Sequence, residues 1–120
     1  MSQPVKTILL VVALFAATPA TAQFLGLGFE SNIELTKHDL ALIRQTVDQK
    51  VHDHPIGTTA SWSNGESGNY GNIRLLKEYT SGGLRCETVE YTLATKRMAV
   101  HPEHYTLNSC RQPDGTWRIS

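Results

Sequence analysis

The sequence predicts an α+β fold in which one N-terminal helix packs on an antiparallel meander of about five strands, with one disulfide. Three observations predict this fold. One stretch carries apolar residues at spacings of three and four, several later stretches alternate between apolar and polar residues, and the chain has only two cysteines. Since the helix has one apolar stripe and the sheet one apolar face, we expect the two to pack as layers.

The first 22 residues predict a secretory signal peptide. A short start with one lysine precedes an apolar run at 8–17, which is too short to span a bilayer. Ala20 and Ala22 then supply the small residues of a cleavage site. We therefore expect export and cleavage after Ala22, with no cysteine at the new N-terminus to carry a lipid.

The remaining chain divides into a flexible N-terminal segment at 23–35 and an α+β domain at 36–120. The apolar residues of 23–29 are also able to dock on the fold or touch a membrane. Eleven basic residues balance eleven acidic ones, so the chain has no global attraction to nucleic acid or anionic lipid. No transmembrane helix is expected after the signal peptide.

The helix begins at Thr36, an N-cap residue that forms a capping box with Asp39. Pro55 and Gly57 end it near residues 52–53. Its apolar stripe consists of Leu40, Ile43, Val47 and Val51.

Strands are expected at 58–62 and 72–80, separated by a glycine- and asparagine-rich turn at 63–71. Ser81, Gly82 and Gly83 form a three-residue hairpin loop. This loop places Thr80 opposite Leu84, so that Leu75 lies opposite Val89 and Lys77 opposite Glu87.

Residues 84–93 and 104–110 alternate, and they pair best with Cys86 opposite Cys110. Val89 then faces Leu107, and Tyr91 faces Tyr105. A disulfide between the two cysteines lies on the sheet face away from the helix. It closes a loop of about 25 residues, which stabilises the fold by about 3 to 4 kcal/mol.

The last hairpin turns at Pro113, Asp114 and Gly115. It places Arg111 opposite Trp117, where the guanidinium is able to stack on the indole. Trp117 and Ile119 join the apolar face.

Several of these residues form a recognisable pattern. It consists of Trp62-Ser63-Asn64, Ser67-Gly68-Asn69, Gly71, Cys86 and the run Cys110-Arg111-Gln112-Pro113-Asp114-Gly115-Thr116-Trp117. Over 39–119 the chain resembles the surface-antigen domain of the rickettsial seventeen-kilodalton antigen family. The resemblance implies an envelope protein, often at the outer membrane, with no established catalytic activity.

Many members of that family are lipoproteins with a glycine-rich segment before the domain, and this chain has neither feature. We therefore expect an exported protein that is either periplasmic or associated with the outer membrane at the cell surface. Its expected partner is an unknown envelope component.

Candidate chemistry is sparse. His52 and His54 form one pair and His101 and His104 another, and together they are able to bind zinc, nickel or copper. The simpler interpretation is a polar helix end and a solvated loop, so we assign no metal and no cofactor. No nucleophile motif is present, and we expect no enzyme and no catalytic residue.

A binding role is favoured, with Asn64, Glu66, Asn69 and Tyr70 as a possible binding loop. The alternative for this loop is a purely structural turn. Trp62 and Trp117 are expected in the core. The sequence thus predicts a structural or binding role in the envelope. A small periplasmic metal- or ligand-binding protein is the alternative, and a hydrolase is the third choice.

Overall fold

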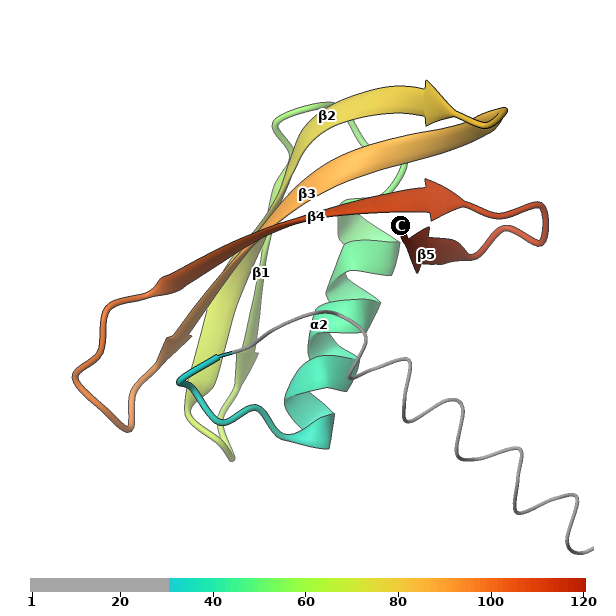
Figure 1. Cartoon of the computed structure of the whole chain (residues 1–120). Coiled ribbons are helices and arrows are strands. Elements are labelled where there is room, and N and C mark those ends of the chain that lie inside the picture. Colours follow the sequence, from blue (N-terminus) through green and yellow to red (C-terminus); the bar gives the residue numbers. More distant parts are fainter. Residues whose placement is uncertain (1–30) are drawn as a thin grey trace, which may run out of the picture.

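The computed structural model describes residues 31–120 and confirms the α+β architecture. Figure 1 shows α2 (Lys37–Lys50) beside a five-stranded sheet. The strands, which all pair antiparallel in the order β1-β2-β3-β4-β5, are β1 (Thr59–Asn64), β2 (Asn69–Ser81), β3 (Leu84–Thr95), β4 (Glu103–Arg111) and β5 (Trp117–Ile119). Strand order follows chain order, as a meander requires.

The predicted capping box starts the helix. The Thr36 hydroxyl accepts a hydrogen bond from the Asp39 N–H at 3.0 Å, and the Thr36 N–H donates to the Asp39 carboxylate at 2.8 Å. The N–H groups of Thr36 and Asp39, which have no partner within the helix, each gain an acceptor in this way. The helix ends at its C-cap, Val51, close to the predicted position.

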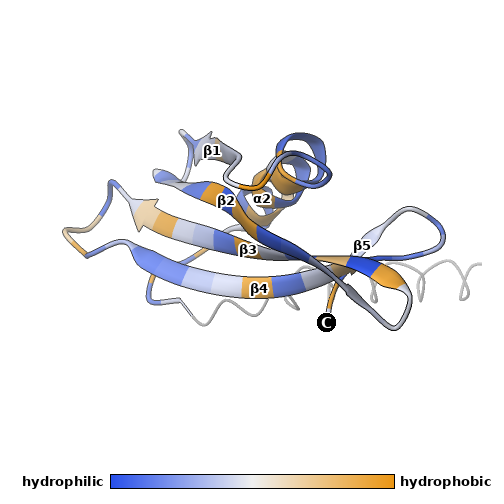
Figure 2. Cartoon of the chain, turned by 90° about the horizontal axis from the view of Figure 1, so that it is seen from above, coloured by the Kyte–Doolittle hydropathy of each residue, from blue (hydrophilic) through white to orange (hydrophobic). Residues whose placement is uncertain are grey.

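The core lies between α2 and one face of the sheet. Figure 2 shows α2 over the β1 and β2 side of the sheet, with β4 away from it. The buried cluster comprises Ile33, Ile43, Val47, Val51, Trp62, Ile73, Leu75, Val89, Tyr91 and Leu93. Trp117 is also buried, so both tryptophans are core residues as expected.

The register of β3 and β4 is the predicted one. Cys86 lies opposite Cys110, and a disulfide joins them with a Cα–Cα distance of 4.0 Å. The neighbouring Glu87 side chain reaches His52 at the end of the helix. Because side chains alternate along a strand, the disulfide lies on the face away from the helix.

The predicted β2–β3 hairpin is wrong by one residue. Ser81, not Thr80, lies opposite Leu84, and the loop consists of Gly82 and Gly83 alone. Their φ values of 57° and 79° suit a two-residue turn whose twist matches the strands. A bulge between Leu75 and Lys77 absorbs the extra residue.

The bulge confines the register error to the hairpin end of the two strands. Leu75 lies opposite Val89, as predicted, because the register shift lies between Leu75 and the hairpin. Nearer the hairpin, Lys77 lies opposite Thr88 and no longer opposite Glu87.

The turn between β1 and β2 is shorter than the expected 63–71. β1 continues to Asn64, β2 begins at Asn69, and these two asparagines pair across the strands. Both asparagines are therefore strand residues, which fixes the direction of their side chains.

The last hairpin forms as predicted, with Arg111 opposite Trp117 and Gly115 at a φ of 88°. Two details differ. Ile119 stays 37% exposed, and the ring that stacks on Trp117 is His52, at a centroid distance of 4.1 Å. The Arg111 guanidinium lies instead 3.6 Å from a carboxylate oxygen of Asp53.

Residues 31–35 pack against the domain through Ile33, which is 3% exposed. The predicted signal peptide and residues 23–30 lie outside the described residues. Within 31–120, none of the helical structure has the length and apolar character needed to span a membrane.

Candidate binding site

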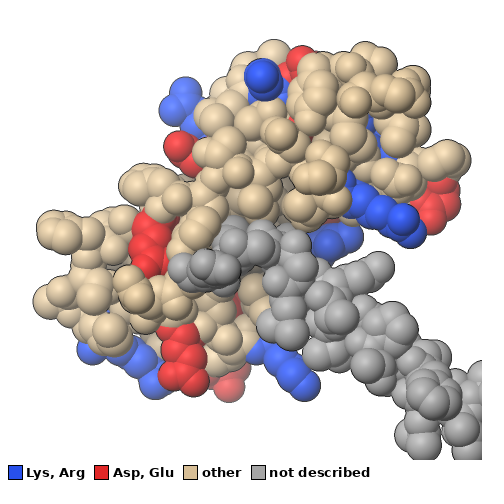
Figure 3. Space-filling model, in the orientation of Figure 1, with Lys and Arg blue, Asp and Glu red and all other residues tan. Residues whose placement is uncertain are grey.

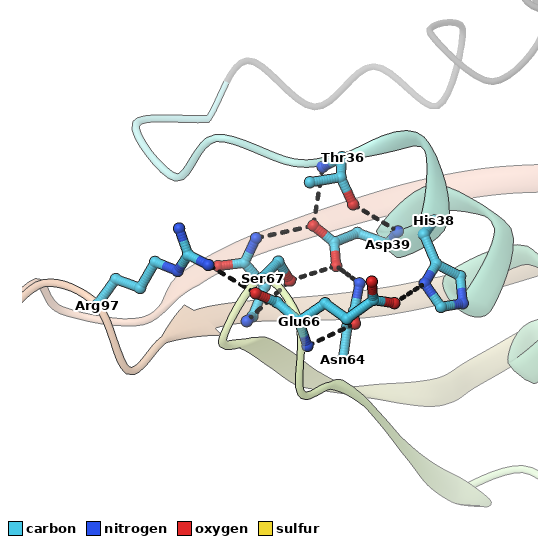
Figure 4. Close-up of polar contacts among 8 residues, drawn as sticks. Thr36, His38, Asp39, Asn64, Glu66, Ser67 and Arg97 are labelled. Atoms are coloured by element: carbon cyan, nitrogen blue, oxygen red, sulfur yellow. Dashed lines mark hydrogen bonds and ion pairs between the residues drawn. The ribbon is translucent and has the colours of Figure 1, made fainter.

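The carboxylate of Asp39 organises one end of the domain. It is fully buried and accepts four hydrogen bonds of 2.7 to 2.8 Å. The donors are the Thr36 N–H, the side-chain amides of Asn64 and Asn69, and the Ser67 hydroxyl (Figure 4). The start of the helix is thus joined to both ends of the β1–β2 turn.

These hydrogen bonds decide the ionisation of Asp39. Burial by itself raises the pKa of the carboxyl, because it removes the charged form from water. The hydrogen bonds from Thr36, Ser67, Asn69 and Asn64 outweigh this effect, and the pKa lies below its ordinary value. Asp39 is therefore a buried anion held by a complete set of donors.

The four residues of the predicted binding loop divide into two groups. Asn64 and Asn69 are buried, and their amides are committed to Asp39. Glu66 and Tyr70 are exposed, and Tyr70 has 40% of its surface accessible. The buried pair therefore holds the turn, and the exposed pair is available to a partner.

A hollow of about 410 Å³ lies between the turn, the start of α2 and the end of β3. Its rim carries groups of both charges. His38 Nδ1 lies 3.2 Å from a Glu66 carboxylate oxygen, and the Arg97 guanidinium donates to the Glu66 carbonyl oxygen at 2.6 Å. Figure 4 shows these three residues around the turn, and Met98 adds an exposed apolar side chain.

A second hollow of about 680 Å³ lies on the β1–β2 hairpin around the same turn. Tyr70 and Lys96 line it, with the ammonium nitrogen 6.0 Å from the centre of the phenol ring. Its other lining residues are serines, asparagines and glycines of the hairpin, together with Trp62. An aromatic ring, a cation and several hydroxyl and amide groups suit a polar ligand.

The face of the molecule drawn in Figure 3 carries no large surface of one charge. Figure 3 shows basic and acidic side chains interspersed over the face that it displays. The hydroxyl, amide and charged groups that line the two hollows suit polar recognition through hydrogen bonds.

The prediction that the histidines are ordinary surface residues is wrong for His52. Its side chain is buried against Trp117, and its Nδ1 lies 2.6 Å from a Glu87 carboxylate oxygen. The other Glu87 oxygen accepts the Asp53 N–H at 3.0 Å. His52 and Glu87 thus join the C-terminal end of α2 to β3.

The structure does not bring the two histidine pairs together. His104 lies opposite Thr92, towards the other end of β3 from Glu87 and its partner His52. In residues 31–120, no group of three or more His, Cys, Asp or Glu side chains is placed to hold a metal ion.

Sequence reasoning missed the roles of Asp39, Asn64 and Asn69 as one network. A usable signal was present, because Asn64 is two residues from Trp62 and so shares its inward direction in a strand. The Glu87–His52 pair had no such signal, since it joins residues 35 apart in the chain.

Comparison with curated proteins finds the 17 kDa surface antigens of several Rickettsia species. The chain is 33% identical over 86 residues to those of Rickettsia conorii and Rickettsia felis, covering 71% of this chain and 52% of each relative. For Rickettsia prowazekii the identity is 32% over 84 residues, covering 69% of this chain and 51% of the relative. The chain thus spans about half the length of the curated relatives it matches. No family model and no solved structure matches.

Proposed function

On the premise that this chain is a surface-antigen-like protein, related to the 17 kDa surface antigens over 86 residues, we propose that it is exported and binds a component of the cell envelope. The proposed location is the periplasm or the outer membrane, including its outer surface. The proposed binding site is the rim formed by His38, Glu66 and Arg97, together with Tyr70.

One observation carries the binding role. The turn that bears Glu66 is fixed by a buried carboxylate, so its exposed groups are held in place before a ligand arrives. Preorganisation of this kind lowers the entropy lost on binding. A hollow lies beside this turn, and the side chains of His38, Arg97 and Met98 line it. A ligand therefore has room to bind next to the exposed groups of the turn.

The proposed role is non-catalytic. The Asp39 carboxylate holds the turn but lines neither hollow, and its lowered pKa keeps it ionised at neutral pH. An effective general acid or base has a pKa near the working pH and is within reach of the substrate, whereas Asp39 is fully buried.

Site-specific photo-crosslinking in living cells tests the proposal. A photoreactive amino acid is placed at Glu66, at Tyr70 and, as the control, at Thr80, an exposed residue near the β2–β3 hairpin. We expect a defined adduct from positions 66 and 70 and none from 80. The substitution Met98→Asp, in the wall of the hollow, is expected to remove the adduct from position 66.

Equal labelling from position 80, or no adduct from either site position, would refute the binding site.

Export has a separate measurement, the mass of the protein recovered from the envelope. A chain that begins at Gln23 supports export, and one that still carries Met1 contradicts it. Calorimetry with zinc, nickel and copper, and a screen of ester, peptide and glycan substrates, test the metal-binding and hydrolase alternatives.

A further inference from the structure

The second hollow opens on the face of the β1–β2 hairpin that points away from α2. Trp62 packs in the core under the helix, and side chains alternate along a strand, so Ser61 and Ser63 point the other way. Asn72 and Tyr70 of β2 lie opposite Ser61 and Ser63, respectively. All four of these residues are exposed and line the hollow of about 680 Å³.

The ring of Tyr70 is the aromatic surface that this hollow offers. Its cross-strand neighbours, Ser63 on β1 and Ala94 on β3, are both small, and Tyr70 keeps 40% of its surface accessible. The ammonium nitrogen of Lys96 lies 6.0 Å from the centre of the ring. An exposed ring beside a cation suits a ligand that has one apolar face and a negative charge.

The backbone that carries these two side chains is held in place. On one side of Tyr70, the Asn69 amide donates to the buried Asp39 carboxylate at 2.8 Å. On the other side, Gly71 lies so close to β3 that an added Cβ would clash with a carbonyl oxygen of that strand. The Lys96 N–H donates to a carbonyl oxygen of the β1–β2 turn at 2.9 Å. The ring and the cation are therefore attached to a preorganised backbone.

Polar groups surround the ring on the same face. The Ser61 hydroxyl donates to the Asn72 side-chain oxygen at 3.0 Å, so the donor groups of that amide point to another acceptor. Ser63 adds a hydroxyl and Lys96 an ammonium group to the same hollow. The polar row continues onto β3, where Thr92 lies opposite Asn72. The lining thus combines hydroxyl, amide and ammonium groups with one aromatic ring.

We propose that this hollow binds a glycan that carries a carboxylate or a phosphate. A sugar ring has a face of C–H groups that stacks on an aromatic ring, and hydroxyl groups at its edge that hydrogen-bond to serine and asparagine side chains. The Lys96 ammonium pairs with the anionic group. This inference rests on the proposed function, because Tyr70 belongs to the proposed binding site, and it names the chemical class of the envelope component. Such a glycan has two sources in an envelope, peptidoglycan and lipopolysaccharide.

A second tyrosine–lysine pair on β2 provides a matched control. Lys77 Nζ lies 5.7 Å from the centre of the Tyr79 ring. Tyr79 is half-buried opposite Cys86, and neither Lys77 nor Tyr79 lines either of the two hollows described above. The same two side-chain types therefore occur on the same strand without the polar groups of the hollow.

Titration of the purified protein with three soluble glycans, followed by NMR, tests the proposal. The probes are the disaccharide N-acetylglucosaminyl-N-acetylmuramic acid, the core oligosaccharide released from lipopolysaccharide, and chitotetraose, which has no charge. We expect one of the two anionic glycans to shift the amide signals of Tyr70 and Lys96, and the one that binds identifies the source. Chitotetraose should bind at least about tenfold more weakly, because it has no partner for the ammonium.

Variants at the two pairs separate the site from the rest of the surface. Tyr70→Ala should weaken binding of the anionic glycan at least about tenfold, whereas Tyr70→Phe keeps the ring and should retain most of the affinity. Lys96→Gln should reduce the affinity for the anionic glycan to that for chitotetraose. Tyr79→Ala and Lys77→Gln should leave it unchanged, and circular dichroism verifies that each variant is folded.

Three outcomes would overturn the proposal: no binding of either anionic glycan, equal binding of chitotetraose, and equal losses in Tyr70→Ala and Tyr79→Ala. The crosslinking experiment separates this failure from failure of the proposed function. A defined adduct from position 66 in cells, together with no glycan binding by the purified protein, would overturn the glycan assignment alone. Glycan binding that depends on Tyr70, with no adduct in cells, would support the glycan assignment and contradict the proposed rim.

Discussion

Replacing Asp39 by asparagine should be among the most damaging changes of one side-chain atom in this domain. The carboxylate oxygens accept four hydrogen bonds, and the amide keeps only one oxygen. About half of the donors would lose their acceptor and meet an NH₂ group instead. Hydrogen bonds to a charged group contribute about 1.5 to 3 kcal/mol each, so we expect a loss of about 3 to 5 kcal/mol.

That loss is a large part of the free energy of unfolding, which for a domain of this size is about 5 to 15 kcal/mol. Urea unfolding measured by circular dichroism is a suitable assay. At an m-value of about 1.5 kcal/mol/M, the midpoint should fall by about 2 to 3 M. The matched control is Asp48→Asn on the same helix, whose exposed carboxylate pairs with Arg44 and lies 3.6 Å from His52 Nε2, and which should cost less than about 1 kcal/mol.

The pH dependence gives a second test. Because the pKa of Asp39 is lowered in the fold, its stabilisation is fully present above the unfolded pKa of 3.8 and is lost as pH falls through the folded value. The difference between parent and Asp39→Asn should therefore be greatest above about pH 5 and shrink in acid. A loss of less than about 1 kcal/mol at neutral pH, or one equal to that of the control, would show that the network does not hold the turn.

Three further predictions concern stability. His52→Ala should cost about 3 kcal/mol, because the buried Glu87 carboxylate loses its bond to the imidazole and keeps the Asp53 N–H, whereas His104→Ala should cost less than about 0.5 kcal/mol. Replacing Cys86 and Cys110 together by serine should lower the free energy of unfolding by about 3 kcal/mol without changing the helix signal in circular dichroism. Gly71→Ala should cost at least about 2 kcal/mol, because an added Cβ would lie 1.8 Å from a carbonyl oxygen of β3.

Chemical denaturation of each variant measures these changes in the free energy of unfolding. Each of the three predictions has an outcome that would contradict it. Equal losses for the two histidine variants would remove the structural role assigned to His52. Rearranged helix packing in the serine variant would place the disulfide in the main core. For the glycine, Gly65→Ala is the control, since a Cβ there would meet no atom within 4 Å. Similar losses at both glycines would contradict the close approach of the strands.

The features that the sequence predicted well depend on neighbours along the chain or on simple alternation. The capping box joins residues only three apart, Thr36 and Asp39. The pairing of Cys86 with Cys110 follows from two alternating strands, because any shift by one residue separates their apolar faces.

The β2–β3 hairpin shows where such reasoning stops. Gly82 and Gly83 suit both a two-residue and a three-residue loop, and the pattern of Leu75 and Val89 is the same in both. The bulge that reconciles the two is a local backbone irregularity with no sequence signature here. The contact of His52 with Glu87 depends on how the helix end meets β3, which local patterns do not specify.

The position of Asp39 also bears on the order of events during folding. Its bonds to Thr36 form within one helical turn, whereas its bonds to Asn64, Ser67 and Asn69 close loops of 25 to 30 residues. Short loops close faster than long ones, so we expect the contacts of Asp39 with Thr36 to form before its contacts with the hairpin. Removing the Thr36 hydroxyl should then slow folding, whereas truncating Asn64 should chiefly accelerate unfolding.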